Sequence, residues 1–158
     1  MIHGNGDDIA IRPASVRDAP AVSRLLRSLA HFIVDDPDAP EVAGFLAGFD
    51  PEAVAARIVD PRYDTWLAVS RDEAIEGMLA MRDHDHVYHL FVEESRHRRG
   101  IASALWAHVR EQAAAARITV NSSPRAEPLY VRFGFVPTGI EQVAGGVRFR
   151  PMAWTREP

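Results

Sequence analysis

The chain contains no cysteine and no lysine, so all 18 of its basic residues are arginines. The absence of cysteine excludes disulfides, thiolate metal ligands and a cysteine nucleophile. The absence of lysine excludes Schiff-base chemistry through a lysine side chain. The formal net charge of −4 argues against general nucleic-acid binding, which normally needs a broad basic face. Local basic patches stay compatible with this charge.

Long apolar runs are also missing from the sequence. No run is long enough to span a bilayer, and residues 1–6 lack the apolar core of a signal peptide. We therefore expect a cytoplasmic protein with no membrane partner. With 158 residues, of which 47% are hydrophobic and 25% charged, the chain is sized for one compact domain over residues 1–158.

Strand-like and helix-like segments alternate along the chain, which indicates an α/β or α+β fold. The expected strands are residues 9–13, 65–70, 75–81, 86–92 and 118–120. Helices are expected after Asp18 as a cap, after Asp50, after Gly100 and over residues 128–133, the first with an apolar stripe of Val22, Leu25, Leu26, Leu29 and Ile33. Residues 35–48 are rich in proline, glycine and acids. Residues 135–136 and 147–149 are expected to form a last hairpin around Gly145 and Gly146.

The most informative segment is the expected strand 86–92 and the basic turn that follows it. His97-Arg98-Arg99-Gly100-Ile101-Ala102 reads as a glycine-containing turn that opens a helix. Such a turn presents unpaired backbone N–H groups and the positive end of a helix dipole, with guanidinium groups beside them. The segment predicts a site for a phosphate or pyrophosphate. The alternative is that Arg96 and the two following arginines form a solvated basic edge.

Two spaced motifs resemble the GNAT superfamily of acyl-CoA-dependent N-acyltransferases, and the resemblance covers nearly the whole chain. Residues 90–105 are similar to the family's cofactor motif, in which Gln or Arg, two residues, Gly, one residue, then Gly or Ala form the pyrophosphate loop. Here these positions are His97, Gly100 and Ala102, so a histidine replaces the commoner Gln or Arg. The later motif is carried by residues 120–124, Ala126, 128–130 and 133–135, and residues 9–14 with Asp18 resemble the family's opening segment.

The resemblance implies a GNAT fold: a single mixed, mostly antiparallel sheet, a central parallel strand pair splayed to hold acyl-CoA, and helices on both faces. In the family, the free edge of the strand that here ends at residues 90–92 pairs with the pantetheine arm, and the backbone amides of residues 98–103 would hold the pyrophosphate. The implied cosubstrate is acetyl-CoA, with no metal. The implied cofactor-binding residues are Leu90, Phe91, Val92, His97, Arg98, Arg99, Gly100, Ile101, Ala102, Ser103, Asn121 and Tyr130.

Three residues are candidates for catalysis. The resemblance assigns Tyr130 as the general acid that protonates the departing CoA thiolate, against the alternative of a packing tyrosine. His86 falls where some GNAT enzymes carry a catalytic glutamate, and His89 is the rival base. The odd separation of these histidines places them on opposite faces of a regular strand unless a bulge intervenes, and either one can be an ordinary sheet residue. The same geometry argues against a metal site made of His84, His86 and His89.

The expected reaction is transfer of an acetyl group from acetyl-CoA to a primary amine by direct attack in a ternary complex. Ser122 and Ser123 do not lie in a glycine-flanked elbow, so a covalent serine intermediate is not expected. A non-catalytic acyl-CoA-binding or sensing module on the same fold is the alternative, and a homodimer stays open. The acidic residues Asp35, Asp36, Asp38 and Glu41 suit either a cationic acceptor or a solvated loop.

Overall fold

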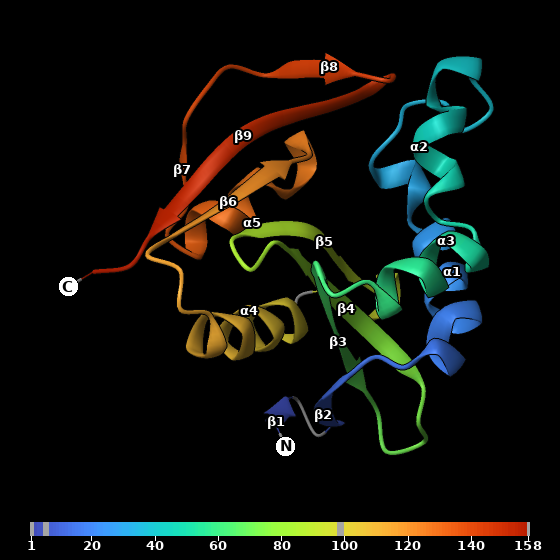
Figure 1. The fold of residues 1–158 in the computed structure, drawn as a ribbon, viewed down its shortest axis with the longest axis vertical. Coiled ribbons are helices and arrows are strands. Elements are labelled where there is room, and N and C mark those ends of the chain that lie inside the picture. Colours follow the sequence, from blue (N-terminus) through green and yellow to red (C-terminus); the bar gives the residue numbers. More distant parts are fainter. Residues whose placement is uncertain (1, 5–6, 98–99, 158) are drawn as a thin grey trace.

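One mixed sheet organises the computed structural model, which describes residues 2–4, 7–97 and 100–157 (Figure 1). Its strands follow the order β1 (Ile2–Gly4), β2 (Asp7–Pro13), β3 (Tyr63–Val69), β4 (Ile75–Arg82), β5 (His86–Val92), β6 (Arg117–Ser122), β9 (Val147–Thr155) and β7 (Val136–Pro137), and β8 (Gln142–Ala144) also pairs with β9. Among these described strands, every pairing is antiparallel except the central pair β5–β6. The expected mixed sheet with one parallel pair is confirmed.

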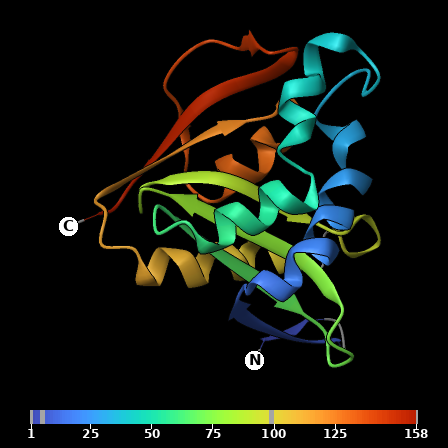
Figure 2. The same cartoon turned by 45° about the vertical axis from the view of Figure 1, so that its right-hand side comes forward.

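Helices cover both faces of the sheet (Figure 2). α1 (Ala19–Ser28) and α3 (Pro51–Val59) pack on one face through a core that includes Val22, Leu26, Phe49 and Leu67. α4 (Ile101–Gln112) and α5 (Glu127–Arg132) pack on the other face through a core that includes Leu79, Leu105, Ile118 and Phe135. Short 3₁₀ turns are η1 (Val16–Asp18), η2 (Ala30–Phe32), η3 (Pro40–Val42), η4 (Glu94–Arg96) and η5 (Pro124–Ala126). None of the described helices has the length and apolar character that a membrane crossing requires.

The expected capping role of Asp18 is wrong in its detail. Asp18 does precede α1, but its carboxylate makes no capping hydrogen bond to that helix. It accepts two hydrogen bonds from the guanidinium of Arg12, at 2.9 and 3.0 Å, and one at 2.8 Å from the backbone N–H of Ser15. A guanidinium fork satisfies both carboxylate oxygens at once, which one capping bond cannot do. Asp18 therefore joins the end of β2 to the start of α1.

The last hairpin also differs from the expectation. Gly145 and Gly146, with φ of 56° and 77°, connect β8 to β9, so β8 rather than residues 135–136 pairs with residues 147–149. Val136 pairs farther along β9, opposite Ala153. A two-residue turn joins the segments that flank it directly, and residues 135–136 are too distant in sequence. The long strand β9 thus pairs with two short strands, β8 and β7, at different points of its length.

Gly146 brings this hairpin close to a segment that the sequence did not predict as helical. Residues 40–47, which lie in the proline- and glycine-rich stretch, form η3 and α2 (Ala43–Ala47). A Cβ atom at position 146 would lie 2.6 Å from Cγ1 of Val42 and 2.8 Å from Cγ of Glu41. Figure 1 shows the β8–β9 end reaching toward α2. Glycine is therefore needed there both for the positive φ and for the close approach.

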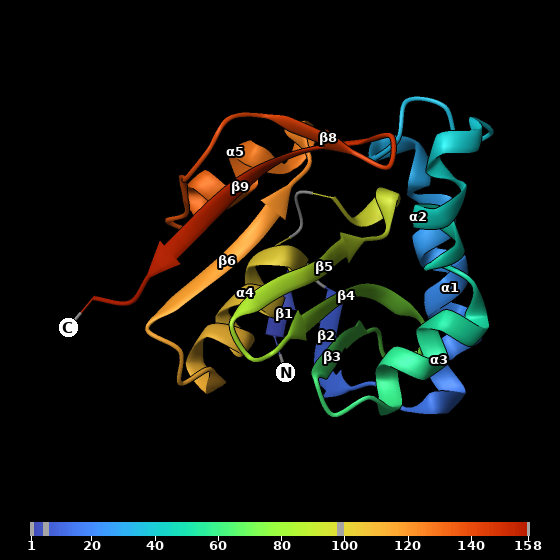
Figure 3. The same ribbon diagram turned by 45° about the horizontal axis from the view of Figure 1, so that its top comes forward.

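The central parallel pair is short, and the two strands then diverge (Figure 3). Only His86 with Thr119 and Val87 with Val120 are paired between β5 and β6. On its other edge β5 stays paired with β4 as far as Val92, but the register shifts because Tyr88 is an extra residue between Val87 and His89. A bulge of this kind bends a strand and increases its local twist. The splayed pair that the sequence predicted is present, and it leaves an opening beside residues 88–92.

The bond network of Asp18 predicts a dependence of stability on pH. The hydrogen bonds from Arg12, with those from Ser15, lower the pKa of the Asp18 carboxyl to about 2. A depressed carboxyl pKa stabilises the folded state above the unfolded-state pKa of about 4, and this contribution disappears as the pH falls toward 2. Asp18→Asn is expected to lower the free energy of unfolding by about 1–2 kcal/mol at pH 7, measured by urea denaturation.

The difference in the free energy of unfolding between Asp18→Asn and the unsubstituted protein should shrink as the pH approaches 2. Asp60→Asn is measured alongside it, because the partly exposed Asp60 is also paired with an arginine, Arg62, which lowers its pKa, so the effect of this substitution should also decrease at low pH. A difference for Asp18→Asn that stays constant from pH 7 to pH 2 would contradict the ionic origin of this contribution.

Candidate functional site

Two adjoining cavities occupy the opening between β5 and β6. The larger one, about 470 Å³, lies between the end of β5, the start of α4 and α5, and the smaller one, about 310 Å³, lies between β5, β6 and the β8–β9 hairpin. Residues that line both cavities are Ile33, Leu90, Phe91, Ser123 and Ala126. The two cavities therefore form one groove that passes the free edge of β5.

The start of α4 lies in the larger cavity. Gly100 takes the left-handed conformation, with φ 79° and ψ 7°, and its carbonyl accepts the first helical bond, from Ala104 at 3.0 Å. The N–H groups of the first helical residues have no intrahelical acceptor. Gly100, Ile101, Ala102 and Ser103, which the sequence proposed as cofactor-binding residues, line this cavity, and Arg98 and Arg99 of the same turn fall outside the described residues. This arrangement suits an anionic group, because the amides and the helix dipole carry positive charge.

Among the described residues, three arginines add positive charge to the larger cavity: Arg96, Arg125 and Arg132. The Arg96 guanidinium forms an ion pair at 3.2 Å with Glu76, whose side chain is almost fully buried. The guanidinium of Arg125 stacks on the Phe32 ring, 3.9 Å from its centroid. The sequence reasoning missed Arg125 and Arg132, although both belong to the segment of the second motif.

His97 takes a structural position at the end of β5. Its Nε2 lies 2.7 Å from the carbonyl oxygen of Val92, and because a carbonyl only accepts, Nε2 is the donor. The ring also lies 5.7 Å from that of Phe32, and His97 lines the larger cavity. The histidine therefore links the turn to the strand, and the Val92 carbonyl already has a partner there. Leu90, Phe91 and Val92 line the cavity along the splayed edge.

Tyr130 reaches the smaller cavity from α5. Its side chain is 5% exposed, and its ring packs at 5.3 Å from that of Phe135. Burial raises the pKa of the Tyr130 hydroxyl above its usual value, so the group holds its proton at neutral pH. A protonated hydroxyl can donate a hydrogen bond or a proton to an anionic leaving group. Asn121, an exposed residue near the end of β6, lines the same cavity but not the larger one.

His86 and His89 both line the smaller cavity. The sequence expected opposite faces for a regular strand, and the bulge at Tyr88 removes that regularity. His86 is half-buried, with its Nδ1 2.7 Å from Oγ1 of Thr119, and burial, together with Arg82, lowers its pKa. His89 is 8% exposed and lies against Phe49, and burial, together with Arg57, lowers its pKa to about 3. Both imidazoles are therefore neutral at pH 7.

The remaining candidates lie elsewhere. His84 is exposed and its Nδ1 lies 2.9 Å from Oδ2 of Asp64. Among the described residues, no group of three or more His, Cys, Asp or Glu side chains is arranged to hold a metal ion. Ser122 is buried and its hydroxyl donates to the Ser123 carbonyl at 2.8 Å. In the acidic stretch, Asp35 forms an ion pair at 3.2 Å with Arg148 of β9.

Comparisons with known proteins agree with this fold. The profile of the acetyltransferase (GNAT) domain family matches residues 33–156. A search of curated protein sequences finds no significant match. Among solved structures, a GCN5-related N-acetyltransferase from Rhodopseudomonas palustris is similar with a TM-score of 0.77 and 20% identity over 99% of each chain. The PaiA N-acetyltransferase of Thermoplasma acidophilum, in complex with coenzyme A, has a TM-score of 0.77 and 13% identity over 94% of this chain and 99% of its own.

An aminoglycoside 6′-N-acetyltransferase complexed with coenzyme A is also similar, with a TM-score of 0.71 and 15% identity over 94% of this chain and 98% of its own. At these identities the structures show a shared fold. These neighbours confirm the fold that was expected from the sequence.

Gly100 provides the test of the anion site. An aspartate at position 100 places a negative charge at the start of α4, where a phosphate would lie, so Gly100→Asp is expected to weaken coenzyme A binding by more than about 100-fold in calorimetry. Gly100→Asn is the matched control, because it brings the same backbone strain and nearly the same shape without the charge. Its affinity should stay within about tenfold of the original.

Both variants should fold, because a Cβ atom at position 100 would meet nothing within 4 Å. The assignment of the anion site fails if Gly100→Asp binds coenzyme A as tightly as Gly100→Asn.

Proposed function

Because the chain belongs to the GNAT acetyltransferase family, we propose that it moves an acetyl group from acetyl-CoA to a primary amine by direct attack in a ternary complex. The observation that carries the proposal is the continuous groove between β5 and β6. One end of the groove holds the start of α4 with Arg96, Arg125 and Arg132, and the other holds Tyr130 and His86. A single GNAT domain over residues 1–158 contains both ends.

The larger cavity suits coenzyme A. Its pyrophosphate would bind the amides at the start of α4, with Arg96, Arg125 and Arg132 supplying positive charge. The pantetheine arm is an amide-containing chain, and it would lie along Leu90–Val92 as an added strand does on a free sheet edge. The bound thioester supplies an activated acetyl group. Its place is the region that both cavities share, which Leu90, Phe91 and Ser123 line.

The acceptor amine must be neutral to attack the thioester carbonyl. A new C–N bond forms, the C–S bond breaks, and the thiolate leaves with a proton that Tyr130 can donate. The amine nitrogen loses its extra proton to a base. The buried Ser122 hydroxyl is already bonded to the backbone, and the chain has no cysteine, so a direct transfer needs fewer assumptions than a covalent intermediate.

His86 suits the role of base better than His89. The pKa of His89, lowered to about 3, makes its imidazole a weak proton acceptor at neutral pH. His86 is less buried and lies within hydrogen-bond distance of Thr119 through Nδ1. When Nδ1–H donates to the Thr119 hydroxyl, Nε2 is left as the acceptor. Thr119 then fixes the ring and its tautomer for proton uptake.

Release of free thiol from acetyl-CoA in the presence of a panel of amines tests this function, and Tyr130→Phe tests the acid in the same assay. The ring and its packing against Phe135 persist in the variant, so coenzyme A affinity should stay within several-fold while kcat falls on the order of 100-fold. Tyr63→Phe, outside both cavities, is the matched control and should keep full turnover.

Equal turnover in Tyr130→Phe and the unsubstituted protein would reduce Tyr130 to a packing residue. Coenzyme A binding without amine-dependent thiol release would instead favour the non-catalytic binding module.

The base assignment predicts a distinct pH profile. His86→Ala is expected to depress the rate most below about pH 7.5, because hydroxide and the growing neutral fraction of the amine replace the base as the pH rises. His84→Ala is the control, since His84 is exposed and lines neither cavity. His89→Ala should lack the acid-side defect. All variants are assayed well below their melting temperatures, so that lost stability does not imitate lost catalysis.

An unchanged pH–rate profile in His86→Ala would remove His86 as the base. An acid-side defect confined to His89→Ala would transfer the role to His89.

A further inference from the structure

Positive charge dominates the described lining of the smaller cavity. Among its described lining residues, the charged side chains are those of Arg82 and Arg148, and Asp and Glu are absent. The acidic stretch from Asp35 to Glu41 was expected to suit a cationic acceptor, but none of its acids belongs to this lining. Asp35 instead forms the ion pair with Arg148. An acceptor whose only charged group is its amine finds no carboxylate partner on these walls.

Arg82 lies beside the proposed base. It is paired with His86 in the register between β4 and β5, and its charge contributes to lowering the pKa of His86. Its guanidinium lies over the Tyr88 ring at 5.6 Å, which limits how the side chain can turn. Its nearest described carboxylate contact is Asp83, 3.8 Å from Nε, which is longer than a hydrogen bond. The fork of Arg82 therefore retains donors for a carboxylate ligand.

We infer that the acceptor is an α-amino acid with an apolar side chain, whose carboxylate binds Arg82 while its amine faces His86. This inference rests on the proposed function and names the substrate class of the same site. In an α-amino acid the amine and the carboxylate are attached to one carbon atom, so the partners of the two groups must lie side by side, as Arg82 and His86 do. Arg148 is less suitable, because it already pairs with Asp35.

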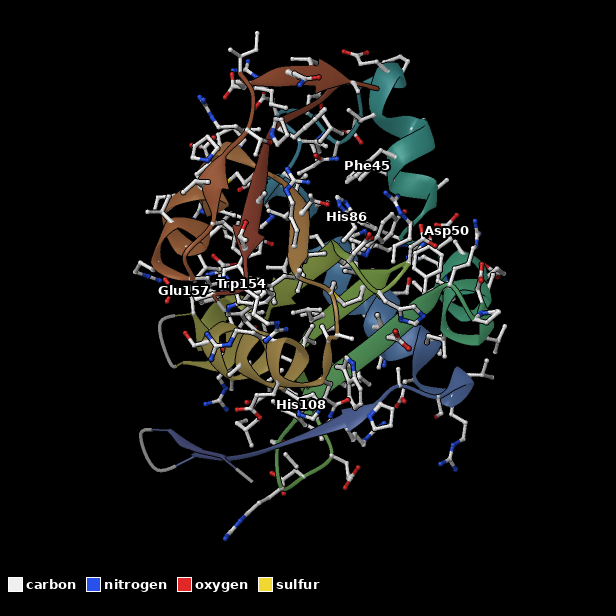
Figure 4. The ribbon with its side chains drawn as sticks, turned by 60° about the vertical axis from the view of Figure 1, so that its left-hand side comes forward. Phe45, Asp50, His86, His108, Trp154 and Glu157 are labelled. Atoms are coloured by element: carbon white, nitrogen blue, oxygen red, sulfur yellow. The ribbon has the colours of Figure 1, made fainter. Side chains whose placement is uncertain are left out.

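The apolar part of the cavity fits the side chain of such an acceptor. Ile33, Phe45 and Phe149 line the same cavity as His86. Figure 4 shows Phe45 extending from the α2 end toward the region of His86, so the aromatic wall and the proposed base belong to one opening. Burying an apolar side chain there would contribute binding energy, and the carboxylate would fix the orientation.

The test compares amino acids with the amines that lack only the carboxylate. The pairs are L-phenylalanine with phenethylamine and L-leucine with isopentylamine, assayed with acetyl-CoA by thiol release. A charge-assisted contact predicts that kcat/KM favours the amino acid by about 10- to 100-fold. Arg82→Gln should abolish this preference, mainly by raising KM for the amino acids. The ratio of kcat/KM for each amino acid to kcat/KM for its amine is compared between the unsubstituted protein and Arg82→Gln. Differences in the intrinsic reactivity of the two amines cancel in this comparison.

Arg62→Gln is the matched control. Arg62 also lies over a tyrosine ring, 5.7 Å from that of Tyr63, and pairs with a nearby aspartate, but it lines neither cavity. It should keep the preference for amino acids. Equal use of amino acids and simple amines by the unsubstituted protein, or a preference that persists in Arg82→Gln, would overturn the inference and leave the acetyltransferase function intact.

Calorimetry with the coenzyme A-saturated protein separates the two proposals without turnover. L-phenylalanine and L-leucine are titrated into the unsubstituted protein, Arg82→Gln and Arg62→Gln. If the unsubstituted protein and Arg62→Gln bind the amino acids, Arg82→Gln does not, and no amine is acetylated, the proposed acetyl transfer is overturned and the ligand class is supported. Absence of both turnover and Arg82-dependent binding would overturn both.

Discussion

The pairing of β5 with β6 ends after two residue pairs, and every part of the site depends on where it ends. A longer parallel ladder would close the sheet and leave no groove. The extra residue at Tyr88 bends β5 while its other edge stays bonded to β4, so the strand diverges from β6 without losing its support. The same bulge places His86 and His89 along one cavity. Sheet geometry, rather than a flexible loop, therefore sets both the groove and the position of the proposed base.

The two ends of the groove use charge in different ways. At the start of α4 the positive potential comes from aligned backbone amides and from arginines on separate elements, a combination that suits a phosphate whatever its substituents. In the smaller cavity the proposed acid and both candidate bases are kept neutral by burial, because the pKa of Tyr130 is raised and those of both histidines are lowered. A neutral acid and a neutral base can then act together near pH 7.

Local patterns predicted much of the fold. Strand β5 has the bounds that the sequence indicated, and Gly100 precedes α4 as expected, because alternation and helix-start signals lie within a few residues of each other. The bulge at Tyr88 could not be predicted, since it depends on the register with β4. The pairing of β7 with β9 and the short helix α2 were also missed, because tertiary packing decides them. Arg82 and Arg125 became candidates only when distant segments were brought to one groove.

The tight contact at Gly146 lies beside the smaller cavity, where we propose that the acceptor amine binds. The β8–β9 hairpin supplies Arg148 and Phe149 to the smaller cavity, and it approaches Val42 so closely that one added methyl group would push the two segments apart. Neither segment contributes to the lining of the larger cavity. Substitutions at this contact would therefore widen or reshape the smaller cavity and leave the larger cavity unchanged. If the smaller cavity holds the acceptor as proposed, proteins of this fold could then differ in acceptor while they keep the same acetyl donor.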